Sequence, residues 1–267
     1  MASVYADLVV ARLRGQASSP RLFALRCVGD ALLTLAEALG PLFLVRRFGS
    51  IAGWSGPEVV MLIGLARTGE GLALVVGRGL EPVLFSETVR LGRFDQVLTR
   101  PVSPLGWLMT TELDLRHLFR ALAGIGLVIW AAASAHVAAT PANVAVLIAS
   151  ALAAAVFVLA VLVMGAALTF RTVEGSDIAN LASNGGIGLV GFPLDLYDGA
   201  LRFVFTFLLP IGLCVYVPVL VVLGRDGPAW WLGPRLLPLL PVAVGGLAAA
   251  ALLSWSAGLR RYKSTGS

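Results

Sequence analysis

Long apolar stretches separated by short polar segments set the pattern of hydrophobic and polar positions along this chain. Each stretch of about 20 apolar residues predicts a helix, because that length is needed to cross a bilayer. Pro57 and Pro141 stand where the second and the fourth of these helices begin, a position that suits proline. The predicted spans cover residues of about 22–46, 57–79, 113–135, 142–170, 177–193 and 235–258.

Residues 1–21 form a shorter and more charged segment than a span requires. Its apolar residues recur at helical spacing, at Val4, Leu8, Val9 and Leu13. Such a pattern is typical of an amphipathic helix, so we expect a helix that lies at the membrane interface.

The apolar run at residues 198–223 is interrupted by Pro210, Gly212 and Pro218. Irregular backbone is tolerated at membrane depth only where protein covers it or water reaches it. We therefore expect a re-entrant helical hairpin that enters and leaves on the same side of the membrane. The alternative is that this run crosses completely, which gives seven spans instead of six.

The distribution of basic residues predicts the orientation of the spans. With a cytoplasmic N-terminus, most of the arginines outside the apolar stretches fall in cytoplasmic segments, as the positive-inside rule requires. Six spans then place the N- and C-termini both in the cytoplasm, whereas seven spans would place the basic C-terminal tail outside.

The composition agrees with a membrane protein along the whole chain. Hydrophobic residues make up 58% of the 267 residues and charged residues 13%, with a mean hydropathy of +0.89. Soluble domains carry about 45–50% apolar and about 25% charged residues. We expect an all-α polytopic membrane protein in which residues 1–267 form a single transmembrane domain. The net charge of +5 suits cytoplasmic loops rather than nucleic-acid binding.

A polar segment between the second and the third span predicts a cytoplasmic helix at residues 86–99. Ser86 suits an N-cap, Glu87 falls in the first turn, and Pro101 stops the helix. We expect this helix to lie along the membrane surface with its apolar face toward the bundle. It is interpreted either as a connector with a solvated charged face or as a docking surface for a cytosolic partner. The apolar face comprises Leu91, Phe94, Val97 and Leu98, and the polar face comprises Glu87, Arg90, Arg93 and Gln96.

Ionisable residues within the first two predicted spans form a candidate intramembrane cluster, because such residues are costly in lipid and are usually paired or functional. Helix rise places Glu37 and Arg67 at a similar depth in an antiparallel hairpin, which predicts an ion pair. Arg26 and Asp30 are four residues apart and can pair along one face. The cluster is interpreted either as a buried salt bridge that fixes register or as a polar wall facing a substrate path. Its members are Asp30, Glu37, Arg67 and Glu70.

The histidines and cysteines give no sign of a metal centre or a disulfide. His117 and His136 lie near the ends of spans, so we expect them at the membrane interface and expect no metal site. Cys27 and Cys214 both lie in apolar runs, which favours free thiols.

Four stretches resemble one family. RLGRFDQVLTRPVSPL, from Arg90 to Leu105, resembles the cytoplasmic signature of bacterial ABC-2 type permeases of the daunorubicin-exporter-like group, approximately R-x-G-x-hydrophobic-D-x-x-L-x-R-P-x-x-P-L. GWSGPEVVMLIGL at 53–65 resembles the entry to the second span of that family. FPLDLYDGALRFVFTFLLPIGLCVYVP at 192–218 and WSAGLRRYKSTGS at 255–267 resemble its later segments. The resemblance therefore extends over nearly the whole chain.

This resemblance implies a permease subunit of an ATP-binding-cassette (ABC) exporter in the cytoplasmic membrane of a bacterium, with drug efflux among the activities of the family. Two permease subunits, identical or homologous, would form the pathway. Two copies of a separate ATPase would bind ATP and Mg²⁺, so that this chain carries no cofactor of its own. The resemblance does not indicate which substrate is carried.

The resemblance also implies that the helix at residues 86–99 is a coupling helix that sits in a cleft of the ATPase. We expect Glu87, Arg90 and Arg93 to face the ATPase. Leu91, Phe94 and Leu98 are expected to anchor the helix to the bundle. The residues implied in coupling are Glu87, Arg90, Arg93, Phe94, Asp95 and Arg100.

The chain offers little support for an enzyme. A Walker A loop requires G-x-x-x-x-G-K-[ST], whereas GLARTGEG at residues 64–71 has no lysine and lies inside a predicted span. A lipid-modifying enzyme is an alternative, since DGALRFVFTFLLPIG at 198–212 resembles the start of a CDP-alcohol phosphotransferase site. The two later metal-binding aspartates of that site are missing.

A secondary-active transporter is the other alternative. Such transporters are commonly built from internal repeats with broken helices in corresponding positions of both halves. Here only the C-terminal half is clearly broken, and no internal repeat is evident in the sequence.

Overall fold

The computed structural model describes residues 2–170, 191–229 and 232–262, and within these parts of the chain it contains helices but no strand. The predicted all-α membrane fold is confirmed. The long helices are α2 (Pro20–Phe48), α3 (Gly56–Gly77), α7 (Arg116–Ser134), α8 (Pro141–Thr169) and α14 (Leu240–Arg261). The shorter helices are α1 (Ala2–Ala17), α4 (Pro82–Arg90), α5 (Arg93–Leu98), α6 (Pro104–Thr111), α11 (Gly199–Phe203), α12 (Ile211–Cys214) and α13 (Tyr216–Leu223).

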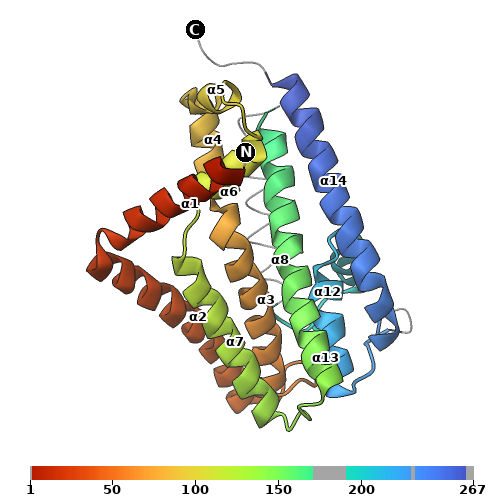
Figure 1. The fold of residues 1–267 in the computed structure, drawn as a ribbon. Coiled ribbons are helices and arrows are strands. Elements are labelled where there is room, and N and C mark those ends of the chain that lie inside the picture. The colour runs from red at the N-terminus through yellow and green to blue at the C-terminus, as the bar shows by residue number, and fades with distance from the viewer. Residues whose placement is uncertain (1, 171–190, 230–231, 263–267) are drawn as a thin grey trace.

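Five of the described helical segments are long and apolar enough to cross a membrane. They match the predicted spans at 22–46, 57–79, 113–135, 142–170 and 235–258, with the second one extended as Gly56–Arg90 through the 3₁₀ turn η1 (Arg78–Leu80). Residues 177–190 of the predicted fifth span lie outside the described residues. The predicted helix at the N-terminus is present as α1, which forms an elbow with α2 (Figure 1).

The helices form an elongated bundle with two distinct ends (Figure 1). One end, here called the α5 end, carries α4, α5 and α6. Both described termini lie there, because Ser103 N donates a hydrogen bond to the hydroxyl of Tyr5 at 3.1 Å and the hydroxyl of Tyr262 donates to Asp95 Oδ1 at 2.9 Å. The opposite end, here called the α13 end, carries the connection between α2 and α3 together with α13.

Helix α3 lies at the centre of the bundle and is the most buried of the candidate spans. It packs between α7 and α8 and along α2. Glycines let the backbones of α3 and α7 approach closely, since a Cβ atom on Gly64 would lie 2.8 Å from the carbonyl oxygen of Gly124. Small residues at such contacts are a common means of packing helices in membranes. A capping box between Ser55 and Glu58 fixes the start of this helix.

Residues 199–223 form a bent pair of helical segments that meet at 74°. The first segment comprises α11 and the π-helix η4 (Val204–Leu208), and the second comprises α12 and α13. Both ends of this pair lie at the α13 end: Arg202 Nη2 donates to the carbonyl oxygen of Asp195 at 3.0 Å, and Arg225 Nη2 donates to that of Gly53 at 3.0 Å. Ser150, in the third turn of α8, donates to the carbonyl oxygen of Cys214 and so supports the break within the pair.

A group of polar and aromatic residues, here called the lock, joins this bent pair to the start of α3. Asp195 Oδ2 accepts hydrogen bonds from Trp54 Nε1 at 2.7 Å and from the hydroxyl of Tyr216 at 2.6 Å. Arg225 Nη1 forms an ion pair with Glu58 Oε2 at 2.9 Å, and its guanidinium lies over the ring of Trp54. The five residues of the lock therefore tie the α13 end together.

Candidate functional site

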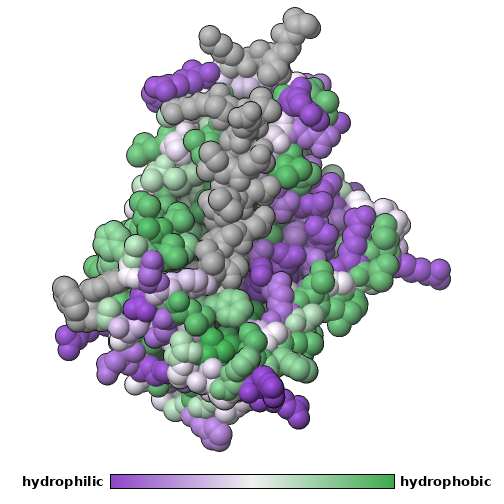
Figure 2. All heavy atoms as spheres, turned by 180° about the vertical axis from the view of Figure 1, so that it is seen from behind, coloured by the Kyte–Doolittle hydropathy of each residue, from purple (hydrophilic) through white to green (hydrophobic). Residues whose placement is uncertain are grey.

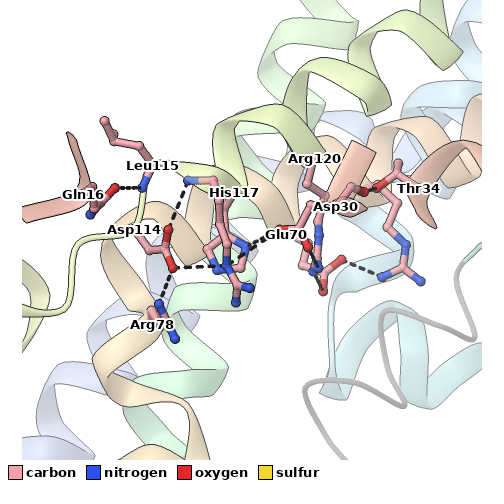
Figure 3. A network of polar contacts seen from close by, with 11 residues as sticks. Gln16, Asp30, Thr34, Glu70, Arg78, Asp114, Leu115, His117 and Arg120 are labelled. Atoms are coloured by element: carbon pink, nitrogen blue, oxygen red, sulfur yellow. Dashed lines mark hydrogen bonds and ion pairs between the residues drawn. The ribbon is translucent and has the colours of Figure 1, made fainter. Parts of the chain in front are cut away.

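A network of charged residues connects α2, α3 and α7 within the bundle, and it is here called the polar network (Figure 3). Its members are Asp30, Glu37, Arg67, Glu70, Arg78, Asp114, Arg116, His117 and Arg120. Four of them come from the sequence prediction and the others were not expected from the sequence.

Arg67 and Glu70 are the members of the network that lie on α3. The predicted pair is present, with Arg67 Nε 2.5 Å from Glu37 Oε2. Arg67 Nη1 also lies 2.6 Å from Glu70 Oε2, while Arg120 Nη1 from α7 reaches Glu70 Oε1 at 3.0 Å. The carboxylate of Glu70 is therefore held by one arginine of its own helix and by one of a neighbouring helix.

Asp30 lies on the buried stripe of α2 and faces α7. Arg120 Nη2 lies 3.5 Å from Asp30 Oδ1, and His117 Nδ1 lies 3.5 Å from Asp30 Oδ2. The expected pairing of Asp30 with Arg26 is wrong, because Asp30 turns inward to α7 whereas Arg26 is exposed and makes no ion pair with any described residue.

Asp114 organises the end of the network nearest to α4. It forms an ion pair with Arg78 and lies 3.1 Å from Arg116 Nε through Oδ2. Its backbone N–H donates to the carbonyl oxygen of Val75 at 3.0 Å, which fixes the chain before α7 against the last turn of α3. Gln16 of α1 joins this region, since its amide oxygen accepts from Leu115 N at 3.1 Å (Figure 3).

His117 was expected at the membrane interface, but it lies inside the polar network. Its exposed fraction is 2%, because it faces α2 and α3 from the first turn of α7. Neither ring nitrogen has a hydrogen-bond partner among the described residues, and neither does Asp30 Oδ2. Arg116, His117 and Arg120 all fall within the third predicted span, so the criterion that singled out Asp30, namely charge inside a span, could have found them.

The network is not sealed from the surface. The side chains of Arg67 and Arg120 keep exposed fractions of 22% and 21%. Figure 2, seen from behind, shows a hydrophilic area at mid-height between the elbow of α1 and α2 and the middle of the molecule. A polar surface at this height is unusual for a helix bundle in lipid, because charged side chains at membrane depth usually face protein or water.

The predicted helix at residues 86–99 is wrong in its boundaries and its shape. The chain forms two helices here, α4 and α5, separated by Leu91 and Gly92. Pro82 starts α4 earlier than expected, so Ser86 lies inside the helix and its hydroxyl donates to the carbonyl oxygen of Val83. Gly92 has a φ of 66°, a left-handed conformation that ends α4 and favours glycine.

Phe94 and Asp95 point into the bundle. Phe94 has an exposed fraction of 0% and makes ring contacts with Phe85, Phe170, Trp255 and Tyr262. Asp95 Oδ1 accepts a hydrogen bond from the hydroxyl of Tyr262 at 2.9 Å. The expected anchoring by Phe94 is confirmed, and Asp95 joins the segment from Arg90 to Leu105 to the end of α14.

Leu91 and Leu98 do not anchor the segment. Their exposed fractions are 50% and 39%, while Val89 and Val97 take the buried positions because the turn at Gly92 changes the helical phase. Six of the exposed residues of this region are here called the tip surface. They are Glu87, Arg90, Leu91, Arg93, Leu98 and Arg100, and the guanidinium of Arg100 lies 4.0 Å from the ring centroid of Trp107.

Comparison with known proteins gives one finding. A family model described as an ABC-2 family transporter protein matches residues 31–266. No curated protein and no solved structure matches the chain. The family match begins within α2 and continues beyond α14, so it contains the tip surface and most of the polar network. The chain therefore belongs to the ABC-2 transporter family, whose members are the membrane-spanning permease components of ABC transporters.

Proposed function

We propose that this chain is the permease subunit of an exporter that a separate ATPase drives through the tip surface. The observation that carries the proposal is the pairing of exposed leucines with arginines on α4 and α5. Leu91 and Leu98 are exposed beside Arg90 and Arg93. One candidate span ends at Arg90, and the other three of these residues lie outside the candidate spans. An apolar patch rimmed by charge is typical of a protein-binding site.

The aromatic packing beneath the tip surface supports a mechanical role for this surface. α5 rests on Phe94, whose ring is packed among rings from α4, α14 and the end of α8. Below it, α3, η1 and α4 follow one another from the α13 end to the α5 end, with one bend at Glu81. A force applied to α5 by closure of the ATPase would therefore reach the centre of the bundle through a stiff path.

The proposal includes six spans with both termini in the cytoplasm. An even number of crossings is supported by the position of α1 and of the end of α14, which both lie at the α5 end. The bent pair at residues 199–223 then acts as a re-entrant hairpin, since its two ends both contact residues of the α13 end. Arginines concentrated at the α5 end support its cytoplasmic placement.

The polar network is assigned to the wall of the transport path. It lies at membrane depth and reaches the surface, and its acids Asp30 and Glu70 each pair with more than one base. We propose that a second permease subunit, identical or homologous, faces this wall, and that two ATPase copies bind below the pair. Export, drug efflux and location in the cytoplasmic membrane of a bacterium follow from the resemblance to the daunorubicin-exporter-like group and belong to the proposal.

The experiment is a pull-down of the full chain in mild detergent from its native membranes. Co-purifying subunits are identified by mass spectrometry, and an ATPase is recognised by its own phosphate-binding loop. The test variant is Arg90→Glu with Arg93→Glu. Its matched control is Arg46→Glu with Arg47→Glu, which makes the same charge change on exposed residues at the far end of α2.

Reversal of two arginines at the tip surface should reduce recovery of the ATPase at least about tenfold, because like charges brought together in an interface cost several kcal/mol. The control should recover the ATPase as the unmodified chain does. If both variants retain it equally, the tip surface is not the docking site. If no ATPase co-purifies even after cross-linking in the membrane, secondary transport becomes the better interpretation.

A further inference from the structure

A cavity of about 420 Å³ lies in the angle between α1 and α2, outside the tip surface. This volume falls within the range of about 300–1,000 Å³ that is typical of small-ligand pockets. Four arginines from four different elements line it: Arg12 of α1, Arg26 of α2, Arg78 of η1 and Arg116 of α7. Asp114 is the one acid among the lining residues.

The charges in this cavity do not cancel. Arg12 Nη2 is paired with Glu112 Oε2 at 3.0 Å, outside the lining. Arg78 and Arg116 share the carboxylate of Asp114, and Arg116 Nε also lies 3.9 Å from Asp30 Oδ2, while Arg26 makes no ion pair with any described residue. The cavity therefore carries excess positive charge, which favours an anionic occupant.

A buried donor also lacks a partner here. The Nε atom of Arg78 is inaccessible and has no hydrogen-bond partner among the described residues. Buried donors without an acceptor are rare and costly in folded proteins, and Arg116 Nε of the same lining is a second one, so the donor groups around this cavity exceed the acceptors. The first turn of α2 adds to the positive potential, because the N-terminus of this 29-residue helix opens on the cavity at Ser18 and Ser19.

The rim of the cavity is apolar on the α2 side. Leu22 and Phe23 belong to the lining, and α2 continues outward with an exposed row of aliphatic residues that includes Leu25, with an exposed fraction of 69%, and Val28. A free phosphate ion makes no favourable contact with such an apolar row. The acyl chain of a lipid can lie along α2 while the lipid head group remains in the cavity.

We propose that this cavity binds the phosphate-containing head group of an anionic phospholipid, whose acyl chains lie along the exposed face of α2. Arg26 is the residue that contacts the phosphate from the membrane side, and Arg78 and Arg116 form the floor. Basic pockets between helices on the cytoplasmic side of membrane proteins recognise lipids by the same chemistry. The site does not require the ATPase to bind the tip surface, so the two proposals fail independently.

The experiment measures lipid binding to the purified full chain in detergent by native mass spectrometry. The probes are phosphatidylglycerol and phosphatidylcholine with the same acyl chains, together with inorganic phosphate as a competitor. The test variant is Arg26→Gln, with Arg26→Lys as the conservative variant. The matched control is Arg21→Gln, which removes the same charge from an exposed position of α2 that does not line the cavity.

The unmodified chain should retain phosphatidylglycerol in preference to phosphatidylcholine. Arg26→Gln should weaken phosphatidylglycerol binding about fivefold, the effect expected for one arginine near an anionic head group, while Arg21→Gln and Arg26→Lys preserve it. Equal retention of the two lipids would overturn the proposal. So would an equal loss in Arg21→Gln, which indicates general surface charge, or displacement of the lipid by inorganic phosphate alone.

Discussion

The lock at the α13 end and the polar network nearer the α5 end both hold α3, and they use charge in different ways. In the lock, Asp195 accepts from two fixed donors, Trp54 and Tyr216, and neither donor has a second acceptor in the group. In the network, Arg67 contacts both Glu37 and Glu70, and Arg120 contacts both Glu70 and Asp30. The lock has one arrangement, whereas the network offers Arg67, Arg116 and Arg120 an alternative acid.

This difference indicates how the two regions respond to change. A set of residues in which each donor has one acceptor holds one geometry, and that geometry is lost when any member is removed. A group with overlapping contacts tolerates the loss of one member, because the remaining charges stay paired. The lock is therefore suited to a fixed joint, and the network is suited to a region that exchanges partners while charges remain compensated.

The largest expected loss in the free energy of unfolding comes from removing both carboxylates that contact a single arginine of the network. Glu37→Gln together with Glu70→Gln leaves the guanidinium of Arg67 without a carboxylate in contact. An uncompensated charge of this kind costs about 3–5 kcal/mol in the free energy of unfolding. Thermal unfolding in detergent measures it, and a loss no greater than the sum of the two single variants would contradict the idea of overlapping contacts.

In the lock, a single neutral substitution should already matter. Asp195→Asn keeps the shape but replaces two charge-assisted hydrogen bonds by neutral ones, so we expect a loss of about 2 kcal/mol. Asp226→Asn is the control, because Asp226 is exposed at the same end of the bundle. The two variants are compared by thermal unfolding, and equal stabilities would show that the lock is not a joint.

The same chemical change in the network should cost less. Glu70→Gln removes the acid that two arginines share, yet Arg67 keeps Glu37 and Arg120 keeps Asp30. We expect a loss of about 1–2 kcal/mol, below that of Asp195→Asn, because no charge is left without a partner. A larger destabilisation than in Asp195→Asn, measured under the same conditions, would reverse the comparison.

The smallest effect is expected for the contact between α14 and α5. Tyr262→Phe removes the hydroxyl that bonds Asp95 but keeps the ring against Phe94 and Phe170. The loss of one hydrogen bond at a half-buried site costs about 1 kcal/mol. If unfolding temperature is unchanged while ATPase recovery falls, this bond positions the tip surface rather than stabilising the fold.

The sequence predicted those contacts that depend on a single pair of adjacent helices. Glu37 and Arg67 could be placed together because a hairpin and the rise of a helix determine their relative depth. The partners on α7 were missed because faces that contact lipid and faces that contact other helices are equally apolar, so the sequence does not show which helix packs where. Arg120 is nevertheless the residue that joins Asp30 to Glu70.

The tip surface was predicted only in outline. The composition of residues 86–99 indicated a cytoplasmic helix, but one glycine in the left-handed conformation divides it and exchanges buried and exposed positions. Gly92 was visible in the sequence, although a glycine within a helical pattern is compatible with either a continuous or a broken helix. The aromatic contacts of Phe94 with α14 depend on tertiary packing that no local pattern records.

The close approach of Gly64 to Gly124 is repeated where a Cβ atom on Gly71 would lie 2.6 Å from the backbone nitrogen of Ala121. At both places the backbones of α3 and α7 are in close contact, so a shift of one helix along the other would bring backbone atoms into collision, and we expect the two helices to move together. If an ATPase docks at the tip surface as proposed, the route from α4 to Trp54 follows the segment Gly56–Arg90, about 50 Å long by helix rise and bent at Glu81. The contacts of α3 and α7 with α2 include the ion pairs Arg67–Glu37 and Arg120–Asp30, so under that proposal a push at α5 is expected to tilt α3 and α7 together against α2.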